Sequence, residues 1–358
     1  MLRLLGSVFG SAALGIIAMC RRLSAPRYRG PVSDHFDGRR FYNSPDTWSP
    51  SFGDFLEWMR TRQPKRWHRA SARPASPPPV DRVGRGRMRV TFIGHATVLL
   101  QMDGLNILTD PIWSERASPV RFAGPRRVHP PGLRFEDLPH IDLVLVSHNH
   151  YDHLDLPTLR RLERAHRPRF LLPLGNAAIL ERAGIAGGED LDWWQGLEVA
   201  EGVRVTLVPS RHFSSRSLCD AWRTLWGSFV VQGPSGAAFF AGDTGFGGHF
   251  EEIARRFAPF RLAILPIGAY EPRWFMAPMH MSPADSVRAA TILRAAVAVG
   301  IHHATFRLSD EGQTQASRDL DEAMGGTDPR MRFWHLDFGE ARDVPESDAA
   351  FEVRFETP

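Results

Sequence analysis

Apolar runs of strand length recur from residue 88 onwards, with stretches of helical periodicity between and after them. Runs of four to eight apolar residues bounded by turn residues predict buried strands, and apolar spacings of three and four predict amphipathic helices. The order shows no fixed repeat, which favours two sheets with outer helices over one doubly wound sheet. The predicted strands are 88–93, 97–101, 105–108, 142–146, 203–208, 237–241, 262–266 and 296–301, and the predicted helices are 156–166, 249–257, 283–295 and 316–324.

The N-terminal region begins with an uncharged apolar run, residues 4–19, with Arg3 before it and Arg21 and Arg22 after it. At about 1.5 Å per residue this run reaches ~24 Å, short of the ~30 Å hydrocarbon core of a bilayer. A signal-like segment and a short anchor both fit this length. We therefore expect residues 1–23 to act in one of these ways, and the protein to be membrane-associated through them, on a cytoplasmic or periplasmic face.

Residues 24–87 are rich in Pro, Arg and Ser and predict an N-terminal extension that ends in an extended linker. The aromatic-rich stretch before the linker fits either a short amphipathic helix packed on the domain or a lipid-facing element. It comprises Trp48, Phe52, Phe55, Leu56, Trp58 and Met59. The compact domain is expected to span residues 88–345, and residues 346–358 form a C-terminal tail.

Composition narrows the class of protein. The 358 residues are 43% hydrophobic and 23% charged, which excludes a disordered chain and leaves ample material for a core. The net charge of +4 comes from one segment, since residues 60–89 hold ten Lys or Arg and one acidic residue. No nucleic-acid-reading module accompanies that segment, so no nucleic-acid partner is expected. Cys20 and Cys219 form neither a disulfide framework nor a CxxC metal pair.

The strongest chemical signal is the sequence SHNHYDHLD at residues 147–155, between an apolar strand and a helical pattern. Imidazole nitrogens and carboxylate oxygens suit Zn²⁺ and related metals. On a loop at a strand's carboxyl end, His148 and His150 can point the same way and bind one ion. Asp152 and His153 can then turn toward a second ion beside it.

A two-metal site needs further ligands from other strand ends. His212, Asp243 and His302 each follow a predicted strand, and together with the loop they make seven candidate ligands. Seven is the number that two ions need when one carboxylate and one water bridge them. We therefore expect two metal ions, with zinc as the first choice.

The remaining histidines are weaker candidates. His303 should face away from His302 if the strand continues, and His95 is expected to orient a ligand or to pack in a loop. His280, in PMHMSP, fits a substrate or phosphate contact and a structural role equally well. Thr109 and Asp110, which follow a strand, are candidates for orienting the ligating histidines, although the turn before Pro111 explains them as well.

The HxHxDH pattern with spaced His, Asp and His resembles the metallo-β-lactamase superfamily, whose fold is an αβ/βα sandwich of two mixed β-sheets with outer helices. Over about residues 41–340 the chain also resembles the N-acyl-phosphatidylethanolamine-hydrolysing phospholipase D family. The segments that carry this resemblance are GHATVLLQMDGLNILTDPIWSERASP (94–119), GPRR (124–127), IDLVLVSHNHYDHLD (141–155), LDWW (191–194), LWGSF (225–229), FFAGDTGF (239–246), PIGAYEPRWFM (266–276) and IHHATF (301–306).

The resemblance implies a catalytic domain at 88–345 and a zinc-dependent phosphodiesterase that releases phosphatidic acid and N-acylethanolamine from phospholipids at a membrane surface. It places His148, His150 and His212 on one zinc, and Asp152, His153 and His302 on the other, with Asp243 bridging. Asp152 is then also the proton-handling residue, and His280 lies near the substrate phosphate. The segments APMHMSP and SRHFSSRSL depart from the family pattern.

Tyr270, Arg273 and Trp274 follow a predicted strand, and we expect them to line the substrate pocket, with Arg273 in an ion pair. Simple packing of the aromatic residues is the alternative. Two other functions stay open: a soluble metal-dependent lactonase or sugar-phosphate hydrolase of the same fold, and a non-catalytic membrane-associated binding protein. A homodimer is also left open.

Overall fold

The computed structural model describes residues 20, 22–43, 50–69, 79–327 and 331–346, and within them two seven-stranded mixed sheets. In spatial order the first sheet contains β14 (Ala341–Asp343), β1 (Met88–Gly94), β2 (Thr97–Met102), β3 (Leu105–Thr109), β4 (Leu143–Leu145), β5 (Arg169–Pro173) and β6 (Gly188–Leu191). The second contains β13 (Arg332–Trp334), β12 (Val297–Ile301), β11 (Leu262–Pro266), β10 (Gly236–Phe240), β9 (Ser228–Gly233), β8 (Val203–Val208) and β7 (Gly196–Ala200).

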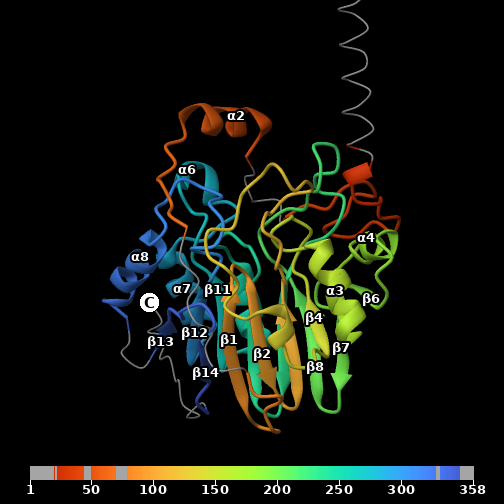
Figure 1. The fold of residues 1–358 in the computed structure, drawn as a ribbon, viewed down its shortest axis with the longest axis vertical. Helices are drawn as coiled ribbons and strands as arrows, with labels where there is room; N and C mark the ends of the chain where they lie inside the picture. The colour runs from red at the N-terminus through yellow and green to blue at the C-terminus, as the bar shows by residue number, and fades with distance from the viewer. Residues whose placement is uncertain (1–19, 21, 44–49, 70–78, 328–330, 347–358) are drawn as a thin grey trace, which may run out of the picture.

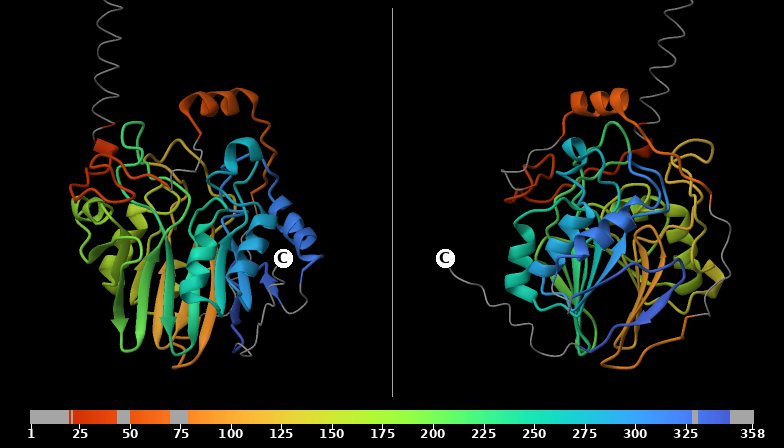
Figure 2. Two further views of the ribbon diagram at one scale, coloured as in Figure 1. Left: turned by 180° about the vertical axis from the view of Figure 1, so that it is seen from behind. Right: turned by 90° about the vertical axis from the view of Figure 1, so that its left-hand side faces the viewer.

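Helices cover the outer faces of the sheets, so the layers run helix, sheet, sheet, helix (Figure 2). A core that includes Phe92, Trp226 and Phe229 lies between the sheets, with further apolar clusters beneath the outer helices. The predicted sandwich of two mixed sheets with outer helices is confirmed. The helices are α2 (Phe52–Thr61), η1 (Phe135–Asp137), α3 (Leu156–His166), α4 (Ala177–Arg182), α5 (His249–Phe257), α6 (Arg273–Met276), α7 (Pro283–Ile292) and α8 (Gln315–Met324).

The strand directions decide where the polar loops lie. Strands β3, β4 and β5 are parallel, and so are β10, β11 and β12. Strand β8 runs antiparallel to β9, which runs antiparallel to β10, so β8 and β10 point the same way. The loops that follow β8, β10 and β12 therefore leave the second sheet at one end, where α6 also lies after β11 (Figure 1).

The prediction of membrane association through an N-terminal apolar segment is wrong. Among the residues that the structure describes, no helix is long and apolar enough to cross a bilayer. Helix α3, with 11 residues, is only about 16 Å long, roughly half of the hydrocarbon thickness. The apolar run 4–19 and the tail 347–358 lie outside the described residues.

The aromatic-rich stretch before the linker forms α2, which lies over the loop end of the sandwich (Figure 1). Its Trp58 is buried and stacks on Phe275 of α6, with the ring centroids 5.0 Å apart. The Trp58 indole N–H also donates to Asp310 Oδ2 at 3.3 Å. These contacts attach α2 to the domain through one face, as expected for an amphipathic helix. Trp48 lies outside the described residues.

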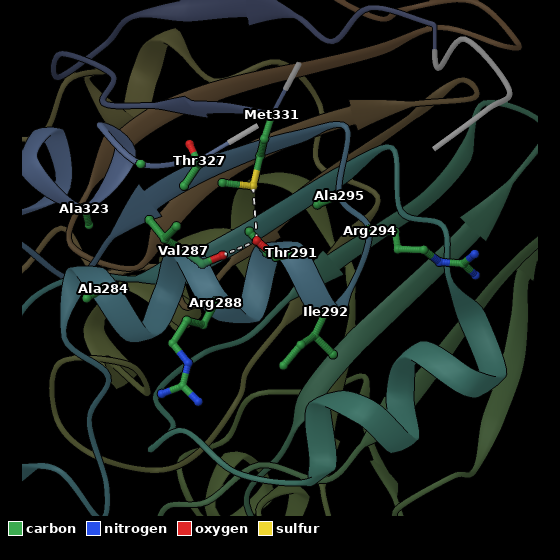
Figure 3. Close-up of a pocket in the computed structure, with 12 residues that line it drawn as sticks. Ala284, Val287, Arg288, Thr291, Ile292, Arg294, Ala295, Ala323, Thr327 and Met331 are labelled. Carbon is green, nitrogen blue, oxygen red and sulfur yellow. Dashed lines mark hydrogen bonds between the residues drawn. The ribbon is translucent and has the colours of Figure 1, made fainter. Parts of the chain in front are cut away.

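An apolar pocket of about 640 Å³ lies between α7 and the end of α8 (Figure 3). Val287 and Ala323 contribute to its wall, and Thr291 and Met331 are joined across it by a contact of 3.7 Å from the hydroxyl to the sulfur. The same hydroxyl donates to the carbonyl of Val287 at 3.0 Å, so this polar group within α7 is satisfied.

His35 attaches the N-terminal extension to the domain, and it makes stability depend on pH. Its Nδ1 lies 2.6 Å from Asp34 Oδ1 and its Nε2 lies 2.8 Å from Asp192 Oδ1, while its ring stacks on Trp193. Burial lowers the pKa of His35, but hydrogen bonds to Asp192 and Asp34 outweigh that effect and raise it above the usual value. The protonated form therefore stabilises the folded state below about pH 6.5, and this contribution disappears as the pH rises through the higher folded pKa.

We expect His35→Gln to lower the melting temperature more at pH 5.5 than at pH 9, since glutamine keeps a polar side chain but cannot become charged. Melting curves of both proteins across this range measure the difference. An equal loss at both pH values would contradict a charged His35 in the folded state.

Candidate metal centre

The loop between β4 and α3 folds into a tight turn that presents four ligand-type side chains inward. The amides of His153 and Leu154 both donate to the carbonyl of His150, at 3.1 and 2.8 Å. This turn brings His148 and His153 ring to ring, with centroids 4.1 Å apart, although five positions separate them. All four side chains of the loop are buried or nearly so: His148, His150, Asp152 and His153.

Three other loops bring their own residues to the same place. His212 follows β8, Asp243 follows β10 and His302 follows β12, each at the carboxyl end of its strand. His302 adopts a positive φ of 63°, and its amide donates to the carbonyl of His95 at 2.8 Å. A Cβ on Gly268 would collide with the carbonyl of His302, so the glycine permits this close approach.

One oxygen, Oδ2 of Asp243, forms the centre of the cluster. It lies 3.1 Å from His302 Nε2 and 3.2 Å from His153 Nε2. On its other side it lies 3.8 Å from His212 Nε2 and 4.0 Å from His148 Nε2. The seven residues chosen from the sequence therefore come together around a shared carboxylate.

The cluster divides into two groups on either side of Asp243. In the first, His150 Nδ1 lies 2.9 Å from His148 Nε2 and 3.2 Å from His212 Nε2. In the second, Asp152 Oδ2 lies 3.4 Å from both His153 Nε2 and His302 Nε2. The ligand atoms of each group are close enough to hold one metal ion. This division matches the two ligand sets that the family resemblance implies.

Three histidine rings of the cluster make hydrogen bonds on the side that faces away from Asp243. These bonds decide which ring nitrogen faces Asp243. His153 Nδ1 donates to Asp110 Oδ2 at 2.6 Å, and His212 Nδ1 lies 3.1 Å from the carbonyl of Met279. Ser147 gives its hydroxyl proton to Asp110, so His148 Nδ1 donates to Ser147 Oγ at 2.9 Å. Each of these rings therefore has Nε2 directed toward the cluster.

Several buried atoms of the cluster have no hydrogen-bond partner among the described residues. These are Nε2 of His153, both ring nitrogens of His302, Oδ1 of Asp243 and Nδ1 of His280. A buried polar atom without a partner is costly, and a cation between the rings would satisfy several at once. His150 Nδ1 lies within 3.2 Å of both His148 Nε2 and His212 Nε2. These three imidazole nitrogens form a donor set that fits zinc or a similar ion.

The charges of the cluster support the same interpretation. Burial alone would raise the pKa values of Asp152 and Asp243, yet the imidazole of His153 holds both well below the usual range. Burial would lower the pKa of His302, but Asp243 and Asp152 raise it to about 9. Burial and the neighbouring imidazoles depress the pKa of His148 well below its usual value. Asp152 and Asp243 therefore stay ionised and His148 stays neutral, as metal binding requires, whereas a bound cation would displace the protons that His153 and His302 hold in its absence.

Asp110 orients the loop between β4 and α3, residues 146–155, which we call the metal-binding loop. It belongs to neither of the two groups of candidate ligands. Its carboxylate accepts hydrogen bonds from the amide of Ser147 at 2.7 Å, from the Ser147 hydroxyl at 2.6 Å and from His153 Nδ1. Asp110 was one of two candidates for this role, and the structure places it beside a predicted ligand. Thr109 instead donates to the carbonyl of Ala96, within the first sheet.

We expect Asp110→Asn to weaken metal binding by about 10–100-fold, because the amide presents a donor to groups that need an acceptor. Competition with a fluorescent zinc chelator measures the affinity. Asp343→Asn, on an exposed ion pair with Arg89, is the matched control and should bind metal like the wild type. Unchanged affinity in Asp110→Asn would show that this carboxylate does not orient His153.

The structure adds His95 to the site, a residue that sequence reasoning placed among orienting or packing residues. Its Nε2 lies 2.9 Å from Asp152 Oδ2, and its ring lies 4.1 Å from that of His302. Burial lowers the pKa of His95 to about 3, so the neutral ring donates a hydrogen bond from Nε2 to the ionised Asp152. The signal for this residue in the sequence was its place after a strand in IGHATV. His303, as expected, faces away and stacks on Phe92.

His280 also lies at the cluster. Its ring centroid is 5.1 Å from that of His212, and its Nδ1 lies 3.9 Å from Asp243 Oδ2. Burial lowers the pKa of His280 to about 4, so the ring is neutral at ordinary pH. Its side chain keeps 14% exposure, more than the buried ligand rings have, which places it at the accessible side of the cluster.

The three predicted substrate contacts lie on the segment between β11 and α7. Arg273 pairs with Asp285 at 2.7 Å, as expected, and also donates to the carbonyl of His280 at 3.1 Å. Tyr270 is buried and donates its hydroxyl proton to Asp319 Oδ2 at 2.5 Å, while Trp274 is 48% exposed on α6. Their role in substrate binding stays a prediction.

Comparisons with known proteins agree with the fold and the metal chemistry. A model of the β-lactamase superfamily domain matches residues 105–303. An uncharacterised protein of Mycobacterium tuberculosis is 43% identical over 250 residues, which cover 67% of this chain and 66% of that protein, just under two thirds of its length.

Two further comparisons differ in what they support. The N-acyl-phosphatidylethanolamine-hydrolyzing phospholipase D 1 of Caenorhabditis elegans is 38% identical over 263 residues, which cover 70% of this chain and 74% of that protein. The solved structure of a metallo hydrolase from Ignicoccus hospitalis covers 72% of this chain and 99% of its own, with a TM-score of 0.55 and 21% identity. At that identity, the solved structure supports the fold alone.

Proposed function

Because this chain belongs to the β-lactamase superfamily and is a metal-dependent hydrolase, we propose that it is a phosphodiesterase that acts on N-acyl-phosphatidylethanolamines. The reaction adds water across the phosphorus–oxygen bond on the ethanolamine side. Its products are phosphatidic acid and an N-acylethanolamine. We further propose that two zinc ions occupy the two groups around Asp243.

The observation that carries this proposal is the convergence of four histidine rings, from three other loops, within 4.0 Å of Asp243 Oδ2. A site with two ligand groups and one shared carboxylate suits hydrolysis of a phosphodiester, in which charge develops on several oxygens at once. The similarity to the nematode phospholipase D over 70% of this chain supports the choice of lipid. The motif GAYEPRWFM at 268–276 belongs to the same resemblance.

The residues that would hold the ions are His148, His150 and His212 for one, and Asp152, His153 and His302 for the other, with Asp243 between them. Bound zinc ions would supply Lewis-acid activation of water and of the phosphate oxygens at neutral pH. The protein's own part is to fix seven donor atoms in place before substrate arrives, with Asp110, Ser147 and the carbonyl of Met279 holding the rings.

We propose that Asp152 moves a proton during the reaction. Its Oδ2 accepts a hydrogen bond from His95 at 2.9 Å and lies at the edge of the cluster with a side-chain exposure of 12%, so it can reach both water and substrate. After the bond to phosphorus breaks, the departing alkoxide oxygen needs a proton, and the Asp152 carboxyl can pass on the one it took from water. His95 fixes the direction of this carboxylate.

We propose that His280 contacts the phosphate. Its ring is neutral and partly exposed, and its Nδ1 has no hydrogen-bond partner among the described residues. A neutral imidazole N–H can donate to a phosphate oxygen whose charge grows during the reaction. Arg273 and Asp285 hold the backbone of His280 through its carbonyl, so they position this ring without contacting the substrate themselves.

The proposal is tested with purified, zinc-loaded protein and N-acyl-phosphatidylethanolamine in mixed detergent micelles, in water enriched in ¹⁸O. We expect N-acylethanolamine and phosphatidic acid in equal amounts, with the label only in the phosphatidic acid, because attack occurs at phosphorus. Phosphatidylethanolamine without the N-acyl chain is the matched control substrate. Turnover of a lactone or a sugar phosphate, with the lipid left intact, would replace this proposal by another hydrolase function.

A further inference from the structure

The two cysteines of the chain lie together, although 199 positions separate them in the sequence. Cys20 is buried and Cys219 is exposed, in the loop that follows His212. Neither belongs to a disulfide. A hydrogen bond that the Cys20 thiol donates to the Cys219 side chain, together with desolvation, raises the pKa of Cys20, so the two side chains are within reach of each other.

The backbone around the pair is held by direct contacts between the two segments. The amide of Ala25 donates to Asp220 Oδ2 at 2.6 Å, and the hydroxyls of Ser24 and Ser217 lie 2.7 Å apart. On one side, the Ser24 hydroxyl donates to the carbonyl of Cys20 at 2.6 Å. On the other side, the amide of Cys219 donates to Ser217 Oγ at 3.0 Å. The two cysteines therefore lie at a defined interface, which joins Cys20 and residues 22–25 to residues 215–220.

This interface connects to the candidate metal centre through Arg216. The Arg216 amide donates to Asp220 Oδ1 at 3.0 Å, next to the cysteine pair. Its buried guanidinium donates to the carbonyls of Asn149 and Leu154, at 2.8 and 3.0 Å. Asn149 lies between His148 and His150 in the sequence, and Leu154 follows His153. Tyr151 completes the connection, since its hydroxyl donates to the carbonyl of Arg216 at 2.9 Å and its ring lies 4.1 Å from the guanidinium.

We propose that Cys20 and Cys219 form a redox modification site, at which a small-molecule disulfide such as oxidised glutathione converts the pair into an intramolecular disulfide that stabilises residues 215–220 and, through Arg216, the metal-binding loop. The inference rests on the metal centre and is independent of the lipid substrate.

The order of the two exchange steps follows from the exposure of the two thiols. Cys219, the exposed thiol, loses its proton and attacks one sulfur of the small disulfide, and one small thiolate leaves. The Cys20 thiolate then attacks the sulfur of Cys219, forms the protein disulfide and releases the second small thiolate. The protein loses two electrons and two protons, and the small disulfide gains them as two thiols. The raised pKa of Cys20 makes the second step faster at alkaline pH.

The bridge should slow loss of metal. It ties the segment at residues 20–25 to the loop that carries Arg216, so the carbonyls of Asn149 and Leu154 keep their donor for longer. It also closes a long loop in the unfolded chain, which favours the folded state. We expect release of zinc to a chelator to slow about threefold to tenfold, and the melting temperature to rise by about 5 °C.

The experiment uses the full chain with bound zinc, treated with oxidised glutathione and compared with the untreated protein. Intact-mass measurement should show a loss of about 2 Da and no remaining reactive thiol, since the bridge removes two hydrogens. Cys20→Ser should instead keep a glutathione adduct on Cys219, and Cys219→Ser should react slowly or not at all. Neither serine substitution touches a candidate metal ligand, so the reduced variants should bind zinc like the wild type.

Three results would overturn the proposal. Stable glutathione adducts on both cysteines of the wild type would show that the thiols cannot meet, and a disulfide between two chains would show that they pair elsewhere. An internal bridge that leaves zinc release unchanged, relative to the reduced protein, would remove the connection through Arg216. None of these results depends on which substrate the enzyme hydrolyses.

Discussion

Asp243→Asn should lower kcat/KM by about 10³-fold or more, which corresponds to ~4 kcal/mol of lost transition-state stabilisation. Oδ2 of Asp243 lies within 4.0 Å of the ring nitrogens of His148, His153, His212 and His302. The amide keeps the size of the side chain but removes the charge that both ligand groups share. Zinc content, measured by mass spectrometry of the metal, should fall together with activity.

The control for this variant makes the same change of charge elsewhere. Asp321 lies on the exposed face of α8, so Asp321→Asn should keep wild-type activity and zinc content. Circular dichroism of both variants separates loss of metal from loss of fold. A folded Asp243→Asn protein with full zinc content and near-wild-type turnover would contradict the role that we assign to this carboxylate.

Removal of metal should have the second large effect. Treatment with a strong chelator should abolish hydrolysis, and added zinc should restore it. A ligand that binds only the folded protein stabilises it by about 4 kcal/mol when present at a thousandfold excess over its Kd. For a chain of this size, that corresponds to a fall in melting temperature of about 5 °C after chelation.

The physical reason for the fall lies in the buried atoms of the cluster. Both ring nitrogens of His302, Nε2 of His153 and Oδ1 of Asp243 have no hydrogen-bond partner among the described residues. Without a cation, these desolvated groups weaken the folded state. Activity and melting temperature that both survive chelation, with zinc absent by metal analysis, would contradict a metal-dependent mechanism in this site.

Much of the fold could be predicted because its central strands are continuously apolar. β11 (LAILP) and β12 (VAVGI) are buried at every position, and such runs are readable from sequence. Two inner strands, β5 and β9, were nevertheless missed, although most of their residues are buried. The edge strands β7 and β14 were missed for the opposite reason. β7 is half-buried and β14 has only three residues, two of them exposed, so neither shows an apolar run or a clear alternation. Pairing with a neighbour, rather than local sequence, makes them strands.

The candidate ligands could be predicted because each follows a strong strand, and parallel strands bring their carboxyl ends together. His95 was harder, because the strand before it pairs antiparallel and a positive φ of 57° turns its ring toward Asp152. The membrane prediction rested on an apolar run of sixteen residues that lies outside the described residues, and it was wrong because no helix within them is long and apolar enough to cross a bilayer. The hydrogen bond from Arg216 to the carbonyl of Leu154 joins residues that are 62 positions apart, so no local pattern in the sequence predicts it.

Anomalous diffraction from crystals of the zinc-loaded protein, measured at the zinc absorption edge, shows directly whether Asp243 and the six side chains around it hold two metal ions. We predict two peaks per chain, about 3.5–4 Å apart, on either side of the Asp243 carboxylate. One peak should lie among His148, His150 and His212, and the other among Asp152, His153 and His302. A single peak, or peaks away from these residues, would contradict the account.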